Sequence, residues 1–243
     1  MRFQICIKQV PDVSASVDTG RMVLNAYDAS AVEEALVLRD QFGGHINLLL
    51  VGPQSAAETI RKALAMGADS ATHLVYEASS DLDSGAISEI LAAELSGAEY
   101  DVVLCGKQAQ DTDAGLTGGM LAERLGLPYT TNAVGLEIDG GQIVVTRQGD
   151  SGRETILLPT PCLVTCSNDM NDPRIPSLKG IMASKKKPIS SRPVESAPDN
   201  ATTMVGFVEP PQRPAVTMID GTDEAEAVER LVRELKNTSK VLQ

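Results

Sequence analysis

Small and hydroxyl-bearing residues gather in the segment GKQAQDTDAGLTGGM, residues 106–120, directly before and into an expected helix. The N–H groups in the first turn of a helix have no partner inside it and carry partial positive charge. They can therefore hold a phosphate without a neighbouring lysine or arginine. Asp113, Gly115 and Thr117 mark this expected phosphate site. The same composition also describes an ordinary helix N-cap, so the residues alone leave both interpretations open.

Side chains for acid, base or metal chemistry are scarce. Asp12, Asp28 and Asp113 could each exchange a proton, but an N-cap or turn role is favoured for all three. His45 and His73 each stand alone near an expected strand, which disfavours a zinc site and a Ser-His-Asp triad. Neither GxGxxG nor the P-loop pattern GxxxxGK followed by Ser or Thr occurs. No catalytic constellation emerges from these residues.

Four cysteines fall in apolar, strand-like segments, namely Cys6, Cys105, Cys162 and Cys166. Because no secretory context accompanies them, buried thiols are favoured over disulfide bridges. Cys162 and Cys166 form a CxxxC pair, which is only a weak signal for redox chemistry.

A second segment with a possible function is the loop 168–188, which follows an expected strand. It carries three apolar residues at short helical spacing, Leu178, Ile181 and Met182, and then a lysine run at 185–187 on an otherwise acidic protein. Apolar anchors beside positive charge suit docking on a partner, because anchors supply affinity and rim charges mainly raise the encounter rate. Composition alone slightly favours the alternative, in which the apolar residues pack on their own domain and the lysines are simply solvated.

The elements that must position these residues follow from hydrophobic periodicity. Short apolar runs alternate with amphipathic stretches in the first half, which predicts βα units on a doubly wound parallel sheet. In such a sheet ligands bind beyond the carboxyl ends of the strands, at the topological switch point. The expected strands are 3–7, 45–51, 71–75, 101–105 and 163–166, and the expected helices are 29–41, 55–66, 83–95 and 116–125.

Within that scheme, Ser55 and Glu58 predict a capping box at the start of the second helix. Beyond residue 129 the pattern predicts an antiparallel extension of the sheet, with strands at 130–138, 142–148 and 154–158. The stretch 189–214 is expected to be an extended linker, followed by an amphipathic helix at 222–235. Such an arm needs a surface to pack on, either its own domain or another subunit, and another subunit is favoured.

Composition limits the possible partners. The chain has 243 residues and a formal net charge of −12, which opposes binding to nucleic acid phosphates. No apolar run reaches the roughly 20 residues that cross a bilayer, and no secretory signal stands at the start, so a cytoplasmic location is expected. Aromatic residues make up only 3%. A nucleotide would therefore be held mainly by main-chain groups.

Several motifs together resemble the beta subunit of electron transfer flavoprotein, over residues 1 to about 190. Arg147, Asp150, Gly152 and Glu154 also stand in the order that this resemblance expects. The motifs are KQVPD (8–12), AVEEAL (31–36), VGPQSAAETIRKALAMGAD (51–69), GKQAQDTDAGLTGGM (106–120), PTPCLVT (159–165) and DPRIPSLKGIMASKKKP (172–188).

The resemblance implies a Rossmann-like, adenine nucleotide alpha hydrolase-like sheet over residues 1–188, including the recognition loop 168–188, and an arm over 189–243 that packs on an alpha subunit. The expected heterodimer carries electrons between flavin dehydrogenases and an acceptor. Its redox FAD is held mainly by the alpha subunit, and AMP lies in this chain. Two alternatives are a second FAD in place of AMP, as in bifurcating members, and a stand-alone adenylate-binding regulatory module. As an electron carrier with AMP in this chain, the protein needs no catalytic residue of its own.

The resemblance also assigns residues. The recognition loop docks on dehydrogenases through Leu178, with Ile181 and Met182 beside it, which reverses the preference from composition. NAYD at 25–28 brings Tyr27 near the flavin. The expected cofactor-binding residues are Ile7, Lys8, Val51, Gly52, Gly106 and Gln108 around adenosine, Asp113, Ala114, Gly115, Leu116 and Thr117 around the phosphate, and Asn25, Tyr27 and Asp28 in the NAYD segment.

Overall fold

A computed structural model of the chain describes residues 1–12, 20–206, 208–209, 211–213 and 215–237. The chain forms two compact units, Met1–Met204 and Val205–Gln243.

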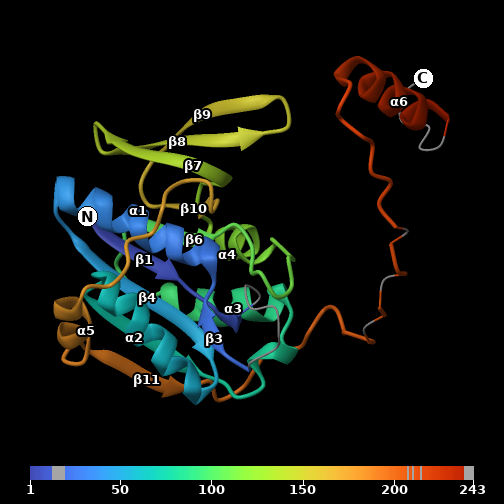
Figure 1. Cartoon of the computed structure of the whole chain (residues 1–243). Helices are drawn as coiled ribbons and strands as arrows, with labels where there is room; N and C mark the ends of the chain where they lie inside the picture. The colour runs from blue at the N-terminus through green and yellow to red at the C-terminus, as the bar shows by residue number, and fades with distance from the viewer. Residues whose placement is uncertain (13–19, 207, 210, 214, 238–243) are drawn as a thin grey trace. The chain divides into compact units, whose positions relative to one another are not determined.

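The first unit is built on a nine-stranded sheet with the order β11-β5-β4-β1-β6-β10-β7-β8-β9 (Figure 1). The strands from β11 to β7 run parallel, whereas β8 pairs antiparallel with both β7 and β9. The sheet strands are β1 (Arg2–Cys6), β4 (His45–Gly52), β5 (Ser70–Val75), β6 (Val102–Gly106), β7 (Tyr129–Asp139), β8 (Gln142–Gly149), β9 (Gly152–Leu158), β10 (Cys162–Cys166) and β11 (Ile189–Pro193).

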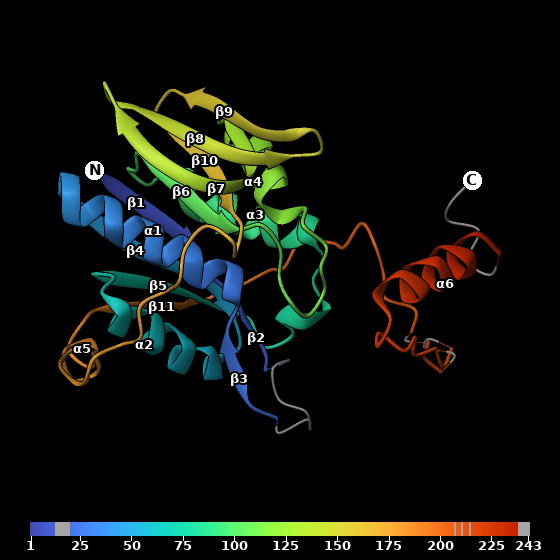
Figure 2. The same ribbon diagram turned by 45° about the horizontal axis from the view of Figure 1, so that its top comes forward.

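Helices cover both faces of the parallel part (Figures 1 and 2). One core cluster joins the sheet to α1 and α2, and a second joins the opposite face to α3 and α4. This explains why β10, CLVTC, is buried at every position, since a strand covered on two sides has no polar face. The helices of the chain are α1 (Ala26–Phe42), α2 (Ala57–Met66), α3 (Ser84–Leu95), α4 (Thr117–Leu125), α5 (Leu178–Ser184) and α6 (Glu224–Asn237).

These elements confirm the doubly wound parallel sheet and its antiparallel extension. The β7–β8 hairpin turns at Gly140 and Gly141, whose φ values of +54° and +83° suit the two central positions of a tight hairpin turn. A small two-stranded sheet of β2 (Gln9–Pro11) and β3 (Met22–Leu24) was not expected. It forms from residues that follow the first strand and precede α1.

The start of α2 differs from the predicted capping box. The N-cap of α2 is Ala56, and no side chain caps it. Ser55 instead lies in a short 3-10 turn, Gln54–Ala56, in which the Ala56 N–H donates to the Pro53 carbonyl. The prediction was wrong because the main chain tightens at this end and supplies its own acceptor, which removes the need for a hydroxyl cap.

The predicted linker 189–214 is also corrected at its beginning. Residues Ile189–Pro193 form β11, an edge strand that pairs in parallel with β5. Four of its five residues are exposed, so its sequence lacks the apolar alternation that marks a half-buried strand. Main-chain pairing with β5 defines it, and a polar sequence is typical of exposed sheet edges.

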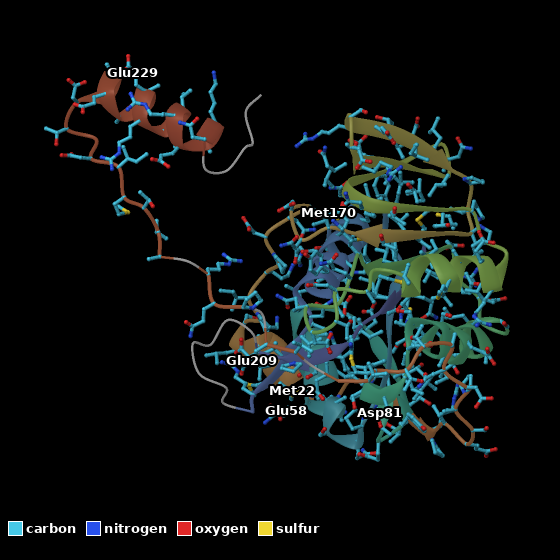
Figure 3. The ribbon with its side chains drawn as sticks, turned by 90° about the vertical axis from the view of Figure 1, so that its right-hand side faces the viewer. Met22, Glu58, Asp81, Met170, Glu209 and Glu229 are labelled. Carbon is cyan, nitrogen blue, oxygen red and sulfur yellow. The ribbon has the colours of Figure 1, made fainter. Side chains whose placement is uncertain are left out.

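The chain that leaves β11 is tied to the start of α3. Asp83 caps α3 by accepting from Ala86 N (2.9 Å), and its second oxygen accepts from the N–H groups of Ala201 (2.8 Å) and Thr202 (2.9 Å). Asn200 Nδ2 donates to the carbonyl of Asp81 (2.7 Å), which Figure 3 labels. The first unit therefore extends beyond residue 188.

The second unit contains α6, close to the predicted helix at 222–235. Asp223 caps it by accepting from the N–H groups of Ala225 (3.0 Å) and Glu226 (3.1 Å). Its apolar residues Val228, Leu231 and Val232 are exposed. Among the described residues, no helix combines the length and apolar composition needed to cross a membrane.

Candidate functional site

The centre of the sheet contains a topological switch point. From β1 the chain winds outward to β4 and β5, and from β6 it winds the opposite way to β10. β1 and β6 are neighbours, and the connections that follow them leave in opposite directions. In open α/β sheets the region outside the carboxyl ends of two such strands is the ligand-binding crevice, and we call that region the crevice. Lys8 follows β1 and Gly106 ends β6. Lys8 and Gly106, both candidates from the sequence, therefore lie at neighbouring strand ends.

Asp28 joins the two strand ends. It lies in the first turn of α1, is 5% exposed, and accepts from Lys8 N with one oxygen (2.7 Å) and from Gly106 N with the other (2.9 Å). Burial raises the pKa of Asp28 to about 7, while the hydrogen bonds and the Lys8 charge oppose that rise. Both carboxylate oxygens are thus occupied by main-chain donors of its own chain.

Asn25, just before α1, holds the loop that follows β6. Its Nδ2 donates to the Gln108 carbonyl (2.8 Å), and its Oδ1 accepts from Gln110 N (3.2 Å). The Gln110 side chain accepts in turn from Ala26 N (3.1 Å). Asn25 and Gln110 therefore cross-link the start of α1 to this loop, which lies more than 80 residues away in the sequence.

The rest of that loop is shaped by short polar contacts and two left-handed residues. Lys8 Nζ pairs with Asp111 (2.8 Å), and Gln108 Nε2 donates to Asp113 Oδ1 (2.8 Å). Asp113 and Gly115 have φ values of +49° and +65°, which turn the chain toward α4. Gln110 and Asp111 were not among the sequence candidates, because their partners are distant in sequence and no local pattern marks them.

The start of α4 offers main-chain donors. Its N-cap is Leu116, and no side chain caps the helix. Thr117 is the first helical residue, and a Cβ on Gly118 would lie 2.5 Å from Thr165 Cγ2, so the first turn is pressed against β10. Uncapped N–H groups at a helix N-terminus are suited to an anion, as the sequence predicts for residues 113–117.

The remaining candidates lie around the same edge of the sheet. Ile7 donates its N–H to the Leu49 carbonyl, which continues the pairing of β1 with β4. Val51 and Gly52 end β4, one strand away from the switch point, and the Gly52 carbonyl accepts from Tyr76 N. Tyr27 lies in α1 beside Gly106. The structure thus gathers Ile7, Lys8, Asn25, Tyr27, Asp28, Gly106 and Gln108 at the crevice, with Val51 and Gly52 at the adjacent strand end and 113–117 leading into α4.

His73 and the four cysteines belong to the core, whereas His45 is exposed. His73 is fully buried, its Nε2 lies 3.3 Å from the Gly52 carbonyl, and burial lowers its pKa. The four cysteines are buried free thiols, as predicted. Burial raises the pKa of the Cys162 thiol to about 12, which keeps it protonated and unreactive. Within the described ranges, no group of three or more His, Cys, Asp or Glu could hold a metal ion.

The loop 168–188 is anchored on α1 at its beginning. Arg174 pairs with Glu33 through its Nε (2.8 Å) and again through Nη2 (2.9 Å). Asn171 Nδ2 donates to Glu34 (3.0 Å) and to the Ser30 carbonyl (3.1 Å). Burial raises the pKa of Glu34. This part of the loop is therefore held against the domain by side-chain contacts.

The second half of the loop forms α5, which packs on α2. A Cβ on Gly180 would lie 2.5 Å from the Ala65 carbonyl oxygen, so the two helices approach closely. Leu178 and Met182 are 82% and 70% exposed, and Ile181 is 44% exposed. The reading from composition, in which the apolar residues pack into their own domain, is wrong for these side chains. Gly180 faces α2, and the larger residues Leu178, Ile181 and Met182 are exposed to solvent.

The lysine run is not uniform, and Lys187 departs from the prediction that all three lysines are solvated. Lys185 and Lys186 are exposed, but Lys187 Nζ donates to the carbonyls of Leu64 (3.0 Å) and Ala68 (2.5 Å) at the end of α2. Arg61 on α2 donates to the Ser184 carbonyl (2.5 Å) and the Lys187 carbonyl (2.7 Å). The end of α5 is thereby fastened to α2.

Lys187→Met is expected to lower the free energy of unfolding by about 1–3 kcal/mol, because two carbonyls at the end of α2 lose their donor. Lys186→Met, one position earlier and exposed, is the matched control and should change it by less than about 0.5 kcal/mol. Urea unfolding of both variants measures the difference. Equal stability of the two would refute the capping role of Lys187.

Comparison with known proteins gives consistent matches. The Electron transfer flavoprotein domain family matches residues 13–197. "Caffeyl-CoA reductase-Etf complex subunit CarD" of Acetobacterium woodii is 36% identical, covering 97% of this chain and 98% of that protein. "Acryloyl-CoA reductase electron transfer subunit gamma" of Anaerotignum propionicum is 33% identical, covering 97% and 98%. "Electron transfer flavoprotein subunit beta" of Bacillus subtilis (strain 168) is 35% identical, covering 93% and 90%.

Proposed function

This chain belongs to the electron transfer flavoprotein family, as a subunit of the beta type, and from that premise we propose that it binds an adenine nucleotide and works in a heterodimer. In this proposal an alpha-type partner holds most of the redox FAD, and the heterodimer passes electrons between flavin dehydrogenases and an acceptor. The chain acts as a carrier subunit. Its own residues bind and orient cofactors and exchange no proton with a substrate.

The single observation that carries the nucleotide site is the switch-point crevice between β1 and β6, with the uncapped start of α4 beyond it. Such a crevice is where open α/β sheets bind nucleotides, and the helix start supplies N–H groups for a phosphate. Thr117 and Gly118 would hold the phosphate through their N–H groups, and Thr117 can add its hydroxyl. The residues present therefore fit AMP.

A second FAD in place of AMP is the alternative. Two relatives that match nearly the whole chain bear the names of reductase-complex or reductase electron-transfer subunits. On the basis of those names, the alternative is that this chain works within a larger reductase assembly that bifurcates electrons. Both nucleotides would place an adenosine phosphate in the same crevice, so the mass of the released nucleotide distinguishes them.

The FAD shared with the partner would meet this chain near Tyr27. Tyr27 lies in the first turn of α1, beside the crevice, and its ring is the aromatic group that the NAYD segment supplies. FAD supplies the one- and two-electron chemistry when bound. The role of this chain would be to cover and orient it.

The arm fits the docking of an alpha-type subunit. The apolar residues Val228, Leu231 and Val232 recur at helical spacing on α6, and all three are exposed within the second unit. Between them and around them α6 is strongly charged. An amphipathic helix of this kind buries its apolar stripe against another surface when it is stably folded. Covering that stripe is the proposed role of the partner.

Co-expression with an alpha-type flavoprotein subunit tests the proposal. We expect a stable, yellow heterodimer that releases one flavin and one adenine nucleotide per complex, the latter with the mass of AMP. A colourless monomer without nucleotide, obtained with every candidate partner, would refute the carrier function. Bound AMP in a chain that joins no flavoprotein would instead support the stand-alone adenylate-binding module.

A further inference from the structure

Asp28 differs from the other candidate cofactor residues because both of its carboxylate oxygens bond to the main chain of this protein. The resemblance places it among the groups that bind a cofactor, but its two oxygens already accept from Lys8 N and Gly106 N. Those donors belong to the ends of β1 and β6, the two strands that flank the switch point. Within the sheet these strands pair from Phe3 to Cys6, and Asp28 continues the connection beyond the last paired residue.

The fit around this carboxylate is tight. A Cβ on Gly106 would lie 2.3 Å from Asp28 Oδ1 and 2.9 Å from Asp28 N. The side chain is 5% exposed, so water reaches it poorly. Neither N–H donor can readily take a water molecule instead, and a buried N–H group without an acceptor is costly. This side chain therefore links the two strand ends beyond their last paired residues.

We propose that Asp28 is a positioning residue: its ionised carboxylate holds the ends of β1 and β6 at the spacing that the nucleotide needs, and loss of its charge weakens nucleotide binding. This inference rests on the proposed nucleotide site. Asp28 acts through the main chain of Lys8 and Gly106, and it needs no contact with the nucleotide to do so.

Neutralising the carboxyl group weakens one of the two hydrogen bonds that it accepts. An ionised carboxylate accepts with both oxygens, whereas the protonated form presents an O–H donor on one of them. The O–H oxygen is a weaker acceptor than a carboxylate oxygen, so the hydrogen bond from either Lys8 N or Gly106 N would weaken. Because the pKa of Asp28 is raised to about 7, mainly by burial, this change falls within a pH range that binding experiments can reach.

The groups around Asp28 are those whose charge or titration could affect it, and we expect Asp28 itself to be the group that titrates in this pH range. Lys8 favours the ionised form by its charge, and the Asn25 side chain favours it by hydrogen bonding. The thiols of Cys105 on β6 and Cys166 on β10 have raised pKa values, Cys105 through its hydrogen bond with Cys6 and burial, and Cys166 through burial. Both stay neutral from pH 6 to 8, so they add no titration of their own.

AMP titration of the nucleotide-stripped full chain at pH 6 and pH 8 tests the proposal. With a pKa of about 7, ionised Asp28 falls from about nine-tenths at pH 8 to about one-tenth at pH 6. We therefore expect the wild type to bind AMP about tenfold more weakly at pH 6, beyond any change seen in Asp28→Asn. Asp28→Asn, which cannot accept with both groups, should bind AMP at pH 8 at least about tenfold more weakly than wild type.

The control and a nucleotide-free readout separate the possible failures. AMP itself titrates near pH 6, and that effect is common to wild type and Asp28→Asn. In wild type without nucleotide, the amide NMR signals of Lys8 and Gly106 should titrate together with a midpoint near 7. The same pH dependence of affinity in both proteins, or amide signals that do not titrate, would overturn the positioning role. No AMP binding at any pH, by contrast, would remove the proposed nucleotide site itself, and this inference with it.

Discussion

Gly106→Ala is expected to abolish measurable nucleotide binding, with a loss of at least about 100-fold in affinity, because the switch point has no room for a side chain. The added Cβ would lie 2.3 Å from Asp28 Oδ1 and 2.7 Å from Tyr27 Cβ. Relief requires α1 to move away from the end of β6, which breaks the bonds of Asp28 to the strand ends. Overpacking of this kind typically also costs about 1–3 kcal/mol of stability.

Gly97→Ala is the matched control for this prediction. Gly97 follows α3, and a Cβ there would meet no heavy atom within 4 Å. Calorimetric AMP titration and thermal unfolding of both variants give the comparison. If Gly106→Ala kept wild-type affinity, the crevice between β1 and β6 would not be the nucleotide site.

Leu178→Ala is expected to slow electron exchange with a partner dehydrogenase by about 30-fold in kcat/KM, which corresponds to an anchor worth about 2 kcal/mol. Leu178 is 82% exposed at the start of α5, so the isolated protein loses little packing when it is truncated. Flavin content and unfolding temperature should therefore stay unchanged. Arg174, which pairs with Glu33 of α1, and Lys187, which donates to Leu64 of α2, hold the two sides of this loop. The loop would therefore present the leucine with little cost in ordering.

Leu157→Ala provides the control for the anchor. Leu157 lies on β9 and is 61% exposed, so it matches Leu178 in type and in exposure but not in place. Stopped-flow mixing with a reduced dehydrogenase, following flavin absorbance, measures the rates of both variants. Equal slowing by Leu157→Ala, or an unchanged rate with Leu178→Ala, would show that α5 does not anchor the partner.

Much of the fold could be predicted because it depends on local periodicity. The apolar runs of β1, β4, β6 and β10 and the amphipathic helices between them led to the parallel sheet and therefore to its switch point. Where main-chain pairing alone decides, periodicity fails. β11 has a polar sequence, and α2 starts on a 3-10 turn instead of on Ser55.

The roles of side chains within the site were less predictable. Residues 25–28 were expected to meet a cofactor, and Asn25 and Asp28 do lie at the crevice, yet their hydrogen bonds go to the chain's own loop and strand ends. Lys187 was one of three similar lysines, and only its position next to the end of α2 sets it apart. Each of these bonds joins residues 20 or more positions apart.

By itself, then, the amino-acid sequence determined the class of sheet and the family to which the chain belongs. These follow from side-chain polarity read along the chain and from motifs at fixed spacing. Only the tertiary structure decided that Asp28 bonds to the end of β6 and that Lys187 bonds to the end of α2. It also decided that the Leu178 side chain is exposed to solvent. A hydrogen bond between distant segments depends on where folding places both partners. The residues next to each partner in the sequence do not determine the distance between the two.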